Sequence, residues 1–150
     1  MPYRMNDVIL LVEDNPDDEE LAIRALRKNN ITNRIVVARD GVEALDLLFG
    51  NHEREPLKPA VVLMDLKLPK LDGVETLERI RANEETRNLP VVMLTTSDQE
   101  SDVVRSYESG VNSYVRKPIE FGELMTVSAQ LGLYWLLLNQ RPRTGPQPED

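Results

Sequence analysis

VILLVEDNPDDEELAIRALRK (8–28) contains one complete strand and helix unit. The run VILLV has no polar residue and is typical of a short strand that is buried on both faces of a sheet. Asn15 and Pro16 predict a helix start, because asparagine caps a first turn well and proline fits within it. Acids follow at 17–20, where the helix dipole is positive, and basic residues precede the expected end at Asn29.

The same alternation recurs four more times along the chain. The further apolar runs are IVVA (35–38), VVLM (61–64), VVML (91–94) and the weaker SYV (113–115). Capping-box spacing marks helix starts after three of them. These pairs are Asp40 with Glu43, Asp72 with Glu75, and Ser97 with Glu100. Alternating strands and helices predict an α/β domain with a doubly wound, five-stranded parallel sheet.

Length and composition favour one domain at 1–140. A chain of 150 residues buries roughly two-thirds of its unfolded surface as a single unit. RPRTGPQPED (141–150) has three prolines and a glycine and predicts a disordered tail. NHEREPLKP (51–59) predicts a polar loop between the second helix and the third strand.

Composition also disfavours several classes of function. A net charge of -8 disfavours binding to the phosphates of nucleic acids. The chain has no cysteine and one histidine, so thiolate and histidine metal clusters are excluded. The N-terminus does not resemble a signal peptide, and no apolar run approaches the length of a membrane span. We therefore expect a protein of the cytoplasm that binds neither nucleic acid nor membrane.

Polar side chains stand where the apolar runs end. Glu13 and Asp14 follow the first run, Asp65 the third, Thr95 the fourth, and Lys117 closely follows the fifth. Because the ligand crevice of an open parallel sheet lies beyond the carboxyl ends of its strands, we expect these five residues to meet. The end of the second run, Arg39-Asp40, is better interpreted as a helix cap.

The three acids predict a site for a hard divalent cation. Two carboxylates about 4 Å apart repel by about 4 kcal/mol at an effective dielectric of about 20, so the cluster needs a compensating cation. Oxygen ligands without histidine or cysteine favour Mg²⁺ or Mn²⁺, and Lys117 adds a further positive charge. The alternative is that the acids are solvated helix caps, which Asp14 taken alone fits equally well.

Asp65 is the predicted reactive acid. It ends the central apolar run, so a stiff strand would hold its carboxylate in the crevice. Carboxylates can form aspartyl phosphates, and catalysis of phosphoryl transfer is mostly positioning and electrostatic stabilisation. Thr95 could donate its hydroxyl to a phosphoryl oxygen, and Lys117 could pair with another.

The ordered motifs VEDN, LMDLKLPKLDG, TTS and YVRKP closely resemble the receiver domain of two-component response regulators. The resemblance covers roughly residues 6–138 and implies a flavodoxin-like (βα)5 fold that accepts phosphate from a histidine kinase. It implies that Asp65 is the phosphoacceptor and that Glu13, Asp14, Asp65 and the backbone carbonyl of Lys67 bind the metal. It also implies that Thr95 and Lys117 contact the phosphate and that the Lys117–Pro118 peptide bond is cis.

The resemblance further implies a switch and an output surface. Thr95 would move toward the phosphate and Tyr114 would turn inward. Apolar residues of the last two helices predict a partner surface, with Tyr107, Tyr134, Trp135 and Leu137 as its members. A narrower resemblance, carried by NHEREPLKP and GLYWLLLNQRP, is to regulators partnered with phytochrome-type kinases. It implies a homodimer through the fourth helix, fifth strand and fifth helix.

Two other functions compete with this interpretation. Metal-dependent phosphatases of the haloacid-dehalogenase type also combine an aspartyl nucleophile, a hydroxyl residue, a lysine and magnesium. They place the nucleophile in a DxD motif after the first strand, where this chain has Glu13-Asp14-Asn15. The other alternative is a scaffold with a receiver fold that is never phosphorylated, which the intact set of site residues disfavours.

Overall fold

The structure is a computed structural model that describes residues 8–96, 99 and 110–130. Its elements in chain order are β1 (Ile9–Val12), α1 (Pro16–Lys28), β2 (Ile35–Ala38), α2 (Gly41–Phe49), β3 (Val61–Asp65), α3 (Gly73–Ala82), β4 (Val91–Thr95), β5 (Ser113–Arg116) and α5 (Phe121–Gln130). Several predicted features lie outside the described residues. They are the cap at Ser97 and Glu100, the surface residues Tyr107, Tyr134, Trp135 and Leu137, and the tail 141–150. The domain boundary at 140 therefore stays a prediction.

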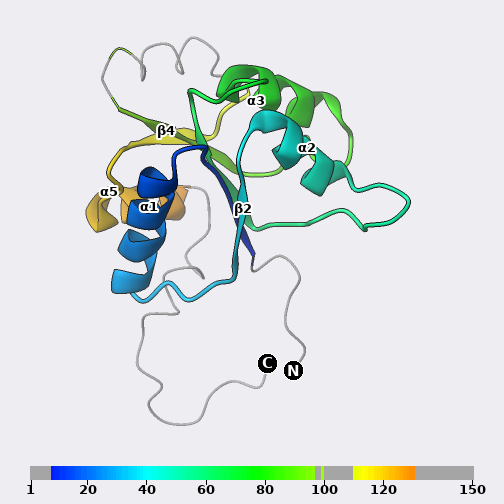
Figure 1. The fold of residues 1–150 in the computed structure, drawn as a ribbon. Helices are drawn as coiled ribbons and strands as arrows, with labels where there is room; N and C mark the ends of the chain where they lie inside the picture. Colours follow the sequence, from blue (N-terminus) through cyan, green and yellow to red (C-terminus); the bar gives the residue numbers. More distant parts are fainter. Residues whose placement is uncertain (1–7, 97–98, 100–109, 131–150) are drawn as a thin grey trace.

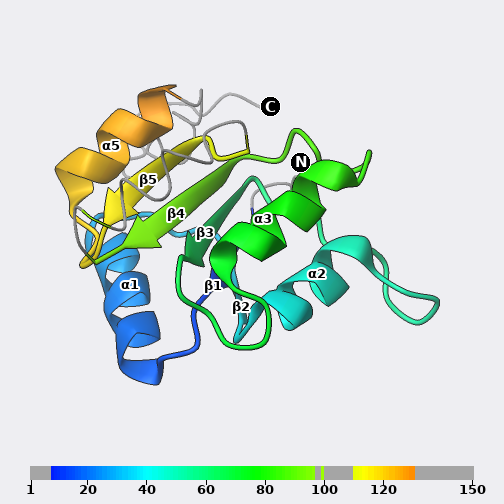
Figure 2. The same cartoon turned by 90° about the horizontal axis from the view of Figure 1, so that it is seen from above.

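The five strands form one parallel sheet in the order β2-β1-β3-β4-β5. Helices α1 and α5 cover one face of this sheet, and α2 and α3 cover the other (Figures 1 and 2). This confirms the predicted doubly wound parallel α/β architecture. The order reverses between β1 and β3, which leaves a crevice at the carboxyl ends of these two neighbouring strands.

Alternate residues of the central strands pack into two separate cores. Ile9 and Leu11 contact the core under α1 and α5, while Leu10 and Val12 contact the core under α2 and α3. This is the side-chain period of a strand with helices on both faces. The prediction of burial on both faces holds for β1, β3 and β4 but not for β2 and β5, which are only partly buried because they form the edges of the sheet.

Side-chain caps fix the starts of the three helices that follow β1, β2 and β3. The Asn15 side chain accepts hydrogen bonds from the backbone of α1, and Asp72 and Glu75 form the predicted capping box of α3. At α2, the Asp40 side chain accepts from the Glu43 backbone N–H, but the Glu43 carboxylate accepts from the Arg39 N–H rather than from the Asp40 N–H. Helices α1 and α2 therefore begin within a few residues of a strand end, whereas a longer segment connects Asp65 to the start of α3 at Gly73. No helix in the described part of the chain is long and apolar enough to cross a membrane.

The loop predicted between α2 and β3 is tied to the core at one point. Gly50 adopts a left-handed backbone, with a φ of 72°, as the chain leaves α2. The Leu57 N–H donates a hydrogen bond of 2.8 Å to the Leu47 carbonyl, and the Leu57 side chain packs against the core under α2 and α3. Apart from its two prolines, the rest of the loop is polar.

Gly41 allows α2 and α3 to pack closely, and we expect Gly41→Ala to destabilise the fold by about 2 kcal/mol. A Cβ at position 41 would overlap the Thr76 hydroxyl and the Leu71 carbonyl, and neither atom lies at the end of a flexible side chain. Gly122→Ala in α5 is the matched control, because a Cβ there meets nothing within 4 Å. Urea denaturation should show a loss of stability for Gly41→Ala alone. Equal stability of the two variants would contradict this prediction.

Candidate functional site

Three carboxylates meet at the carboxyl ends of β1 and β3. Glu13 and Asp14 directly follow β1, and Asp65 is the last residue of β3. One carboxylate oxygen of each residue lies within 4.8 Å of the other two. Glu13 and Asp65 are buried, whereas Asp14 is exposed. Asp14 is not a helix cap, because Asn15 occupies that position.

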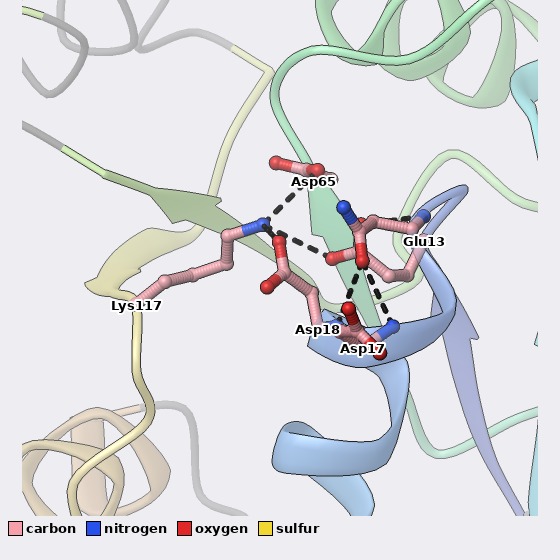
Figure 3. Close-up of polar contacts among 6 residues, drawn as sticks. Glu13, Asp17, Asp18, Asp65 and Lys117 are labelled. Carbon is pink, nitrogen blue, oxygen red and sulfur yellow. Dashed lines mark hydrogen bonds and ion pairs between the residues drawn. The ribbon is translucent and has the colours of Figure 1, made fainter.

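The Lys117 ammonium contacts Glu13 and Asp65 of this cluster and also Asp18 (Figure 3). Its Nζ is 3.1 Å from Glu13 Oε1, 3.2 Å from Asp65 Oδ2 and 3.0 Å from Asp18 Oδ2. The Lys117 backbone is held at the end of β4, where its N–H donates to the Thr95 carbonyl at 2.7 Å. The next peptide bond, Lys117–Pro118, is cis. Residues that lie 52 and 104 positions from Lys117 in the chain are thus its direct partners.

The other predicted site residues occupy the same edge of the sheet or lie close behind it. Thr95 is fully buried as the last residue of β4 and pairs in register with Arg116 of β5. Tyr114 is half-buried and packs against the core under α2 and α3. Lys67 is exposed and, together with Asp14, lines a hollow of about 510 Å³. The structure therefore brings Glu13, Asp14, Asp65 and Lys117 together, with Thr95 at the adjoining strand end.

Burial governs the protonation of the buried acids. It raises the pKa of Glu13 to about 7, helped by the negative charge of Asp65 and opposed by the Asn15 N–H and by Lys117. Burial also raises the pKa of Asp65, against the lowering effect of Lys117. One lysine therefore does not fully compensate the acids, and a further cation would favour their ionised forms.

For Lys117, the neighbouring acids outweigh burial and favour the charged form. Burial by itself would lower the pKa of Lys117, but the hydrogen bond to Asp18 and the charges of Asp65 and Glu13 together raise it above its usual range. The ammonium is therefore charged at neutral pH. A fixed positive charge beside Asp65 is suited to stabilising negative oxygens that arrive at that carboxylate.

Asp18 is a member of this ion-pair cluster that the sequence interpretation missed, since it counted Asp18 only among the acids of the first helical turn. The position of Asp18 in the sequence nevertheless indicated that it could lie near the site. Because α1 begins directly after β1, an acid in its first turn lies at the edge of the sheet where Glu13 and Asp14 also lie. The site thus combines four carboxylates with one partly buried ammonium.

Comparisons with known proteins agree with this geometry. The chain matches the family model for the response regulator receiver domain over residues 9–129. It is 43% identical over 135 residues to the probable methanogenesis regulatory protein FilR2 of Methanothrix harundinacea, with 90% of this chain and 87% of that protein covered. It is 40% identical over 131 residues to the response regulator Rcp1 of Synechocystis, with 86% and 88% covered.

Solved structures give the same result. The bacteriophytochrome response regulator AtBRR superposes with a TM-score of 0.80 at 53% identity, covering 85% of this chain and 94% of that chain. The Mn(2+)-bound form of Rcp1 superposes with a TM-score of 0.65 at 38% identity, covering 94% and 98%. With its fold, its strand-end residues and these relatives in agreement, the chain belongs to the family of response regulator receiver domains.

Proposed function

We propose that Asp65 accepts a phosphoryl group from a phosphohistidine of a histidine kinase. The observation that carries this proposal is the Lys117 ammonium, 3.2 Å from an Asp65 oxygen and almost removed from solvent at the crossover of the sheet. The protein is then a regulator that is phosphorylated once and decays slowly, and not a phosphatase that turns over a separate substrate. We place its action in the cytoplasm.

The transfer exchanges one bond to phosphorus for another. An Asp65 carboxylate oxygen attacks the phosphorus, the phosphorus–nitrogen bond breaks, and its electron pair returns to the imidazole, which takes up a proton. Lys117 is placed to pair with a phosphoryl oxygen as negative charge accumulates, and the buried Thr95 ends the adjacent strand, where its hydroxyl could donate to another. The negative charges of the acids would oppose this transfer unless a bound cation compensated them.

The acids are suited to hold Mg²⁺ or Mn²⁺. Glu13, Asp14 and Asp65 offer oxygen ligands close together, which is the donor set that hard cations prefer, and the Lys67 carbonyl is our candidate for a further ligand. Such a cation supplies charge neutralisation for the phosphoryl oxygens. The Mn(2+)-bound structure of the similar protein Rcp1 supports the assignment.

Proton competition gives this metal site a testable pH dependence. Since a cation binds ionised carboxylates, Mg²⁺ must displace the proton that Glu13 retains below a pKa of about 7. We expect the Mg²⁺ affinity to rise with pH, by up to about tenfold per pH unit below that pKa, and to level off above it. Isothermal titration calorimetry in buffers of different ionisation enthalpy would measure both the affinity and the proton release. Glu13→Gln should bind Mg²⁺ more weakly and show a smaller pH dependence, because only the proton on Asp65 is then left to be displaced. An unchanged pH profile in that variant would contradict the assignment to Glu13.

A groove beside the site fits the approach of a kinase. The groove measures about 250 Å³ and is lined by Asp18, Leu21, Leu94, Thr96, Lys117, Pro118 and Ile119. Leu21 on α1 is 51% exposed although its side chain is large and apolar. An apolar helix of the kinase that carries the phosphohistidine would cover Leu21 and bring its imidazole to Asp65. Leu21→Ala should therefore slow transfer from the kinase but not from a small donor.

For the partner we propose a phytochrome-type kinase, and for the output a switch that alters self-association. The likeness to AtBRR, described as a bacteriophytochrome response regulator, supports the kinase assignment. Thr95 and Tyr114 would transmit the effect of phosphorylation to β5, and a homodimer would form through β5, α5 and the fourth helix expected from the sequence. Phosphotransfer profiling against a panel of kinases tests the first part. Light scattering with and without phosphorylation tests the second, and a monomer under both conditions would exclude the dimer.

The phosphoacceptor is tested with a small donor. The purified chain, incubated with Mg²⁺ and acetyl phosphate, should gain the mass of one phosphoryl group. Borohydride reduction of the acyl phosphate followed by peptide mapping should place it on Asp65, and chelation of Mg²⁺ should prevent it. If the protein gained no phosphoryl group, the proposal would be wrong. Sustained hydrolysis of para-nitrophenyl phosphate would favour the phosphatase instead.

A further inference from the structure

Asp18 differs from the other two carboxylates that bind Lys117. Glu13 and Asp65 belong to the cluster whose oxygens are close enough to share a metal ion, whereas Asp18 lies outside that cluster, on α1. Its Oδ2 is 3.0 Å from Lys117 Nζ, the shortest of the three contacts. Figure 3 shows the Asp18 carboxylate on the side of the ammonium that faces α1. One acid therefore holds Lys117 independently of the metal acids.

The backbone of Asp18 is fixed. Its N–H donates to the Asn15 side chain at 3.1 Å, so it is part of the capped first turn of α1. The helix is anchored to the sheet by Ala22 and Leu26, which are buried in the core under α1 and α5. A carboxylate on a capped and anchored turn keeps its place when its surroundings change, as a positioning residue must.

The two metal acids and the phosphoryl group compete for the same ammonium. Lys117 has three N–H donors, which suits its three carboxylate partners. A divalent cation bound by Glu13 and Asp65 would neutralise these acids and repel the ammonium. The attraction that holds the Lys117 ammonium beside Asp65 would then be weaker. The attraction of Asp18, which is not a member of the cluster, would persist.

We propose that Asp18 is a positioning residue that keeps the Lys117 ammonium beside Asp65 when the metal acids are engaged, leaving two N–H donors for phosphoryl oxygens. This inference rests on the proposed phosphoryl transfer to Asp65. Asp18 itself does not touch the reacting atoms. Its effect is on the rate at which a bound donor reacts, because a misplaced ammonium stabilises the transition state less well.

A purely structural role for Asp18 predicts something different. The Asp18 side chain is 39% exposed, and partly exposed ion pairs contribute little to stability. If the pair only joined α1 to the segment after β5, its loss would lower the melting temperature slightly and leave the chemistry unchanged. A positioning role instead lowers the maximal rate at saturating Mg²⁺ and saturating donor, with the melting temperature nearly unchanged.

The test compares Asp18→Asn with Asp17→Asn in the full chain. Asp17 is exposed and precedes Asp18 on α1, so its substitution removes the same charge from almost the same place. With phosphoramidate as donor and saturating Mg²⁺, we expect the maximal phosphorylation rate to fall about tenfold for Asp18→Asn and to stay near wild type for Asp17→Asn. Asp18→Glu, which keeps the carboxylate, should recover most of the rate.

The outcomes separate this inference from the proposed function. If wild type is phosphorylated and Asp18→Asn reacts as fast as Asp17→Asn, the positioning role is wrong while the proposed function stands. Equal slowing of both variants, or slowing of Asp18→Asn that more Mg²⁺ reverses, would also overturn it, because either points to a general charge effect. Failure of wild type to accept any phosphoryl group would refute the proposed function itself.

Discussion

Replacing Asp65 with asparagine is expected to abolish phosphorylation of the protein and to leave its fold intact. The amide has almost the shape of the carboxylate but no nucleophilic oxygen for the aspartyl phosphate. Lys117 keeps Glu13 and Asp18 as partners, so no buried charge is left alone. Intact mass spectrometry after incubation with acetyl phosphate and Mg²⁺ would measure the loss, and circular dichroism would confirm the fold.

The electrostatics of the site sharpen this expectation. Because burial raises the pKa of Asp65, the ionised carboxylate is disfavoured where it stands, and a neutral amide removes that cost. Without metal, Asp65→Asn should therefore melt no lower than wild type. Asp46→Asn, at an exposed position of α2, is the control and should be phosphorylated normally. A phosphoryl group that persisted in Asp65→Asn would show that another acid, such as Glu13 or Asp14, is the acceptor.

The meeting of Asp65 and Lys117 could be predicted from sequence because it depends only on topology. Each residue closely follows a run of apolar residues, and parallel strands present their carboxyl ends at one edge. Their separation of 52 positions does not affect that conclusion, since strand ends coincide whatever the loops contain. The helix starts at Asn15 and Asp72 could be predicted for a similar reason, because a cap acts within its own turn.

The Asp18 contact depends in addition on how α1 is rotated about its axis, which the strand ends do not determine. Asp17 and Asp18 are identical in sequence terms, yet Asp17 is exposed and Asp18 binds Lys117. The rotation is set by the packing of Ala22 and Leu26 in the core under α1 and α5, which is a tertiary feature. The same limit applies to the edge strands, since IVVA is as apolar as the central runs and only the strand order makes it an edge.

Removal of the Lys117 ammonium should strengthen Mg²⁺ binding and slow phosphorylation. Its ammonium competes with any cation at Glu13 and Asp65, because it contacts both carboxylates directly. It is also the only cation within 4.0 Å of Asp65 among the described residues, so it is the group available to pair with a phosphoryl oxygen there. Removing it should therefore favour metal binding and impair the chemistry.

In Lys117→Met we expect Mg²⁺ to bind about tenfold more tightly in alkaline buffer, where the acids are ionised, because a neighbouring positive charge is gone. We expect phosphorylation by acetyl phosphate at saturating Mg²⁺ to be about 100-fold slower, since one charged donor to the transition state is lost. Calorimetry and rapid-quench mass spectrometry measure the two quantities. Lys70→Met, which removes an exposed lysine paired with Asp40, is the control and should change neither. Weaker Mg²⁺ binding together with slower phosphorylation would instead indicate a damaged site. Phosphorylation at the normal rate would show that Lys117 takes no part in the transfer. Only the opposed changes identify Lys117 as a competitor of the metal and a partner of the phosphate at once.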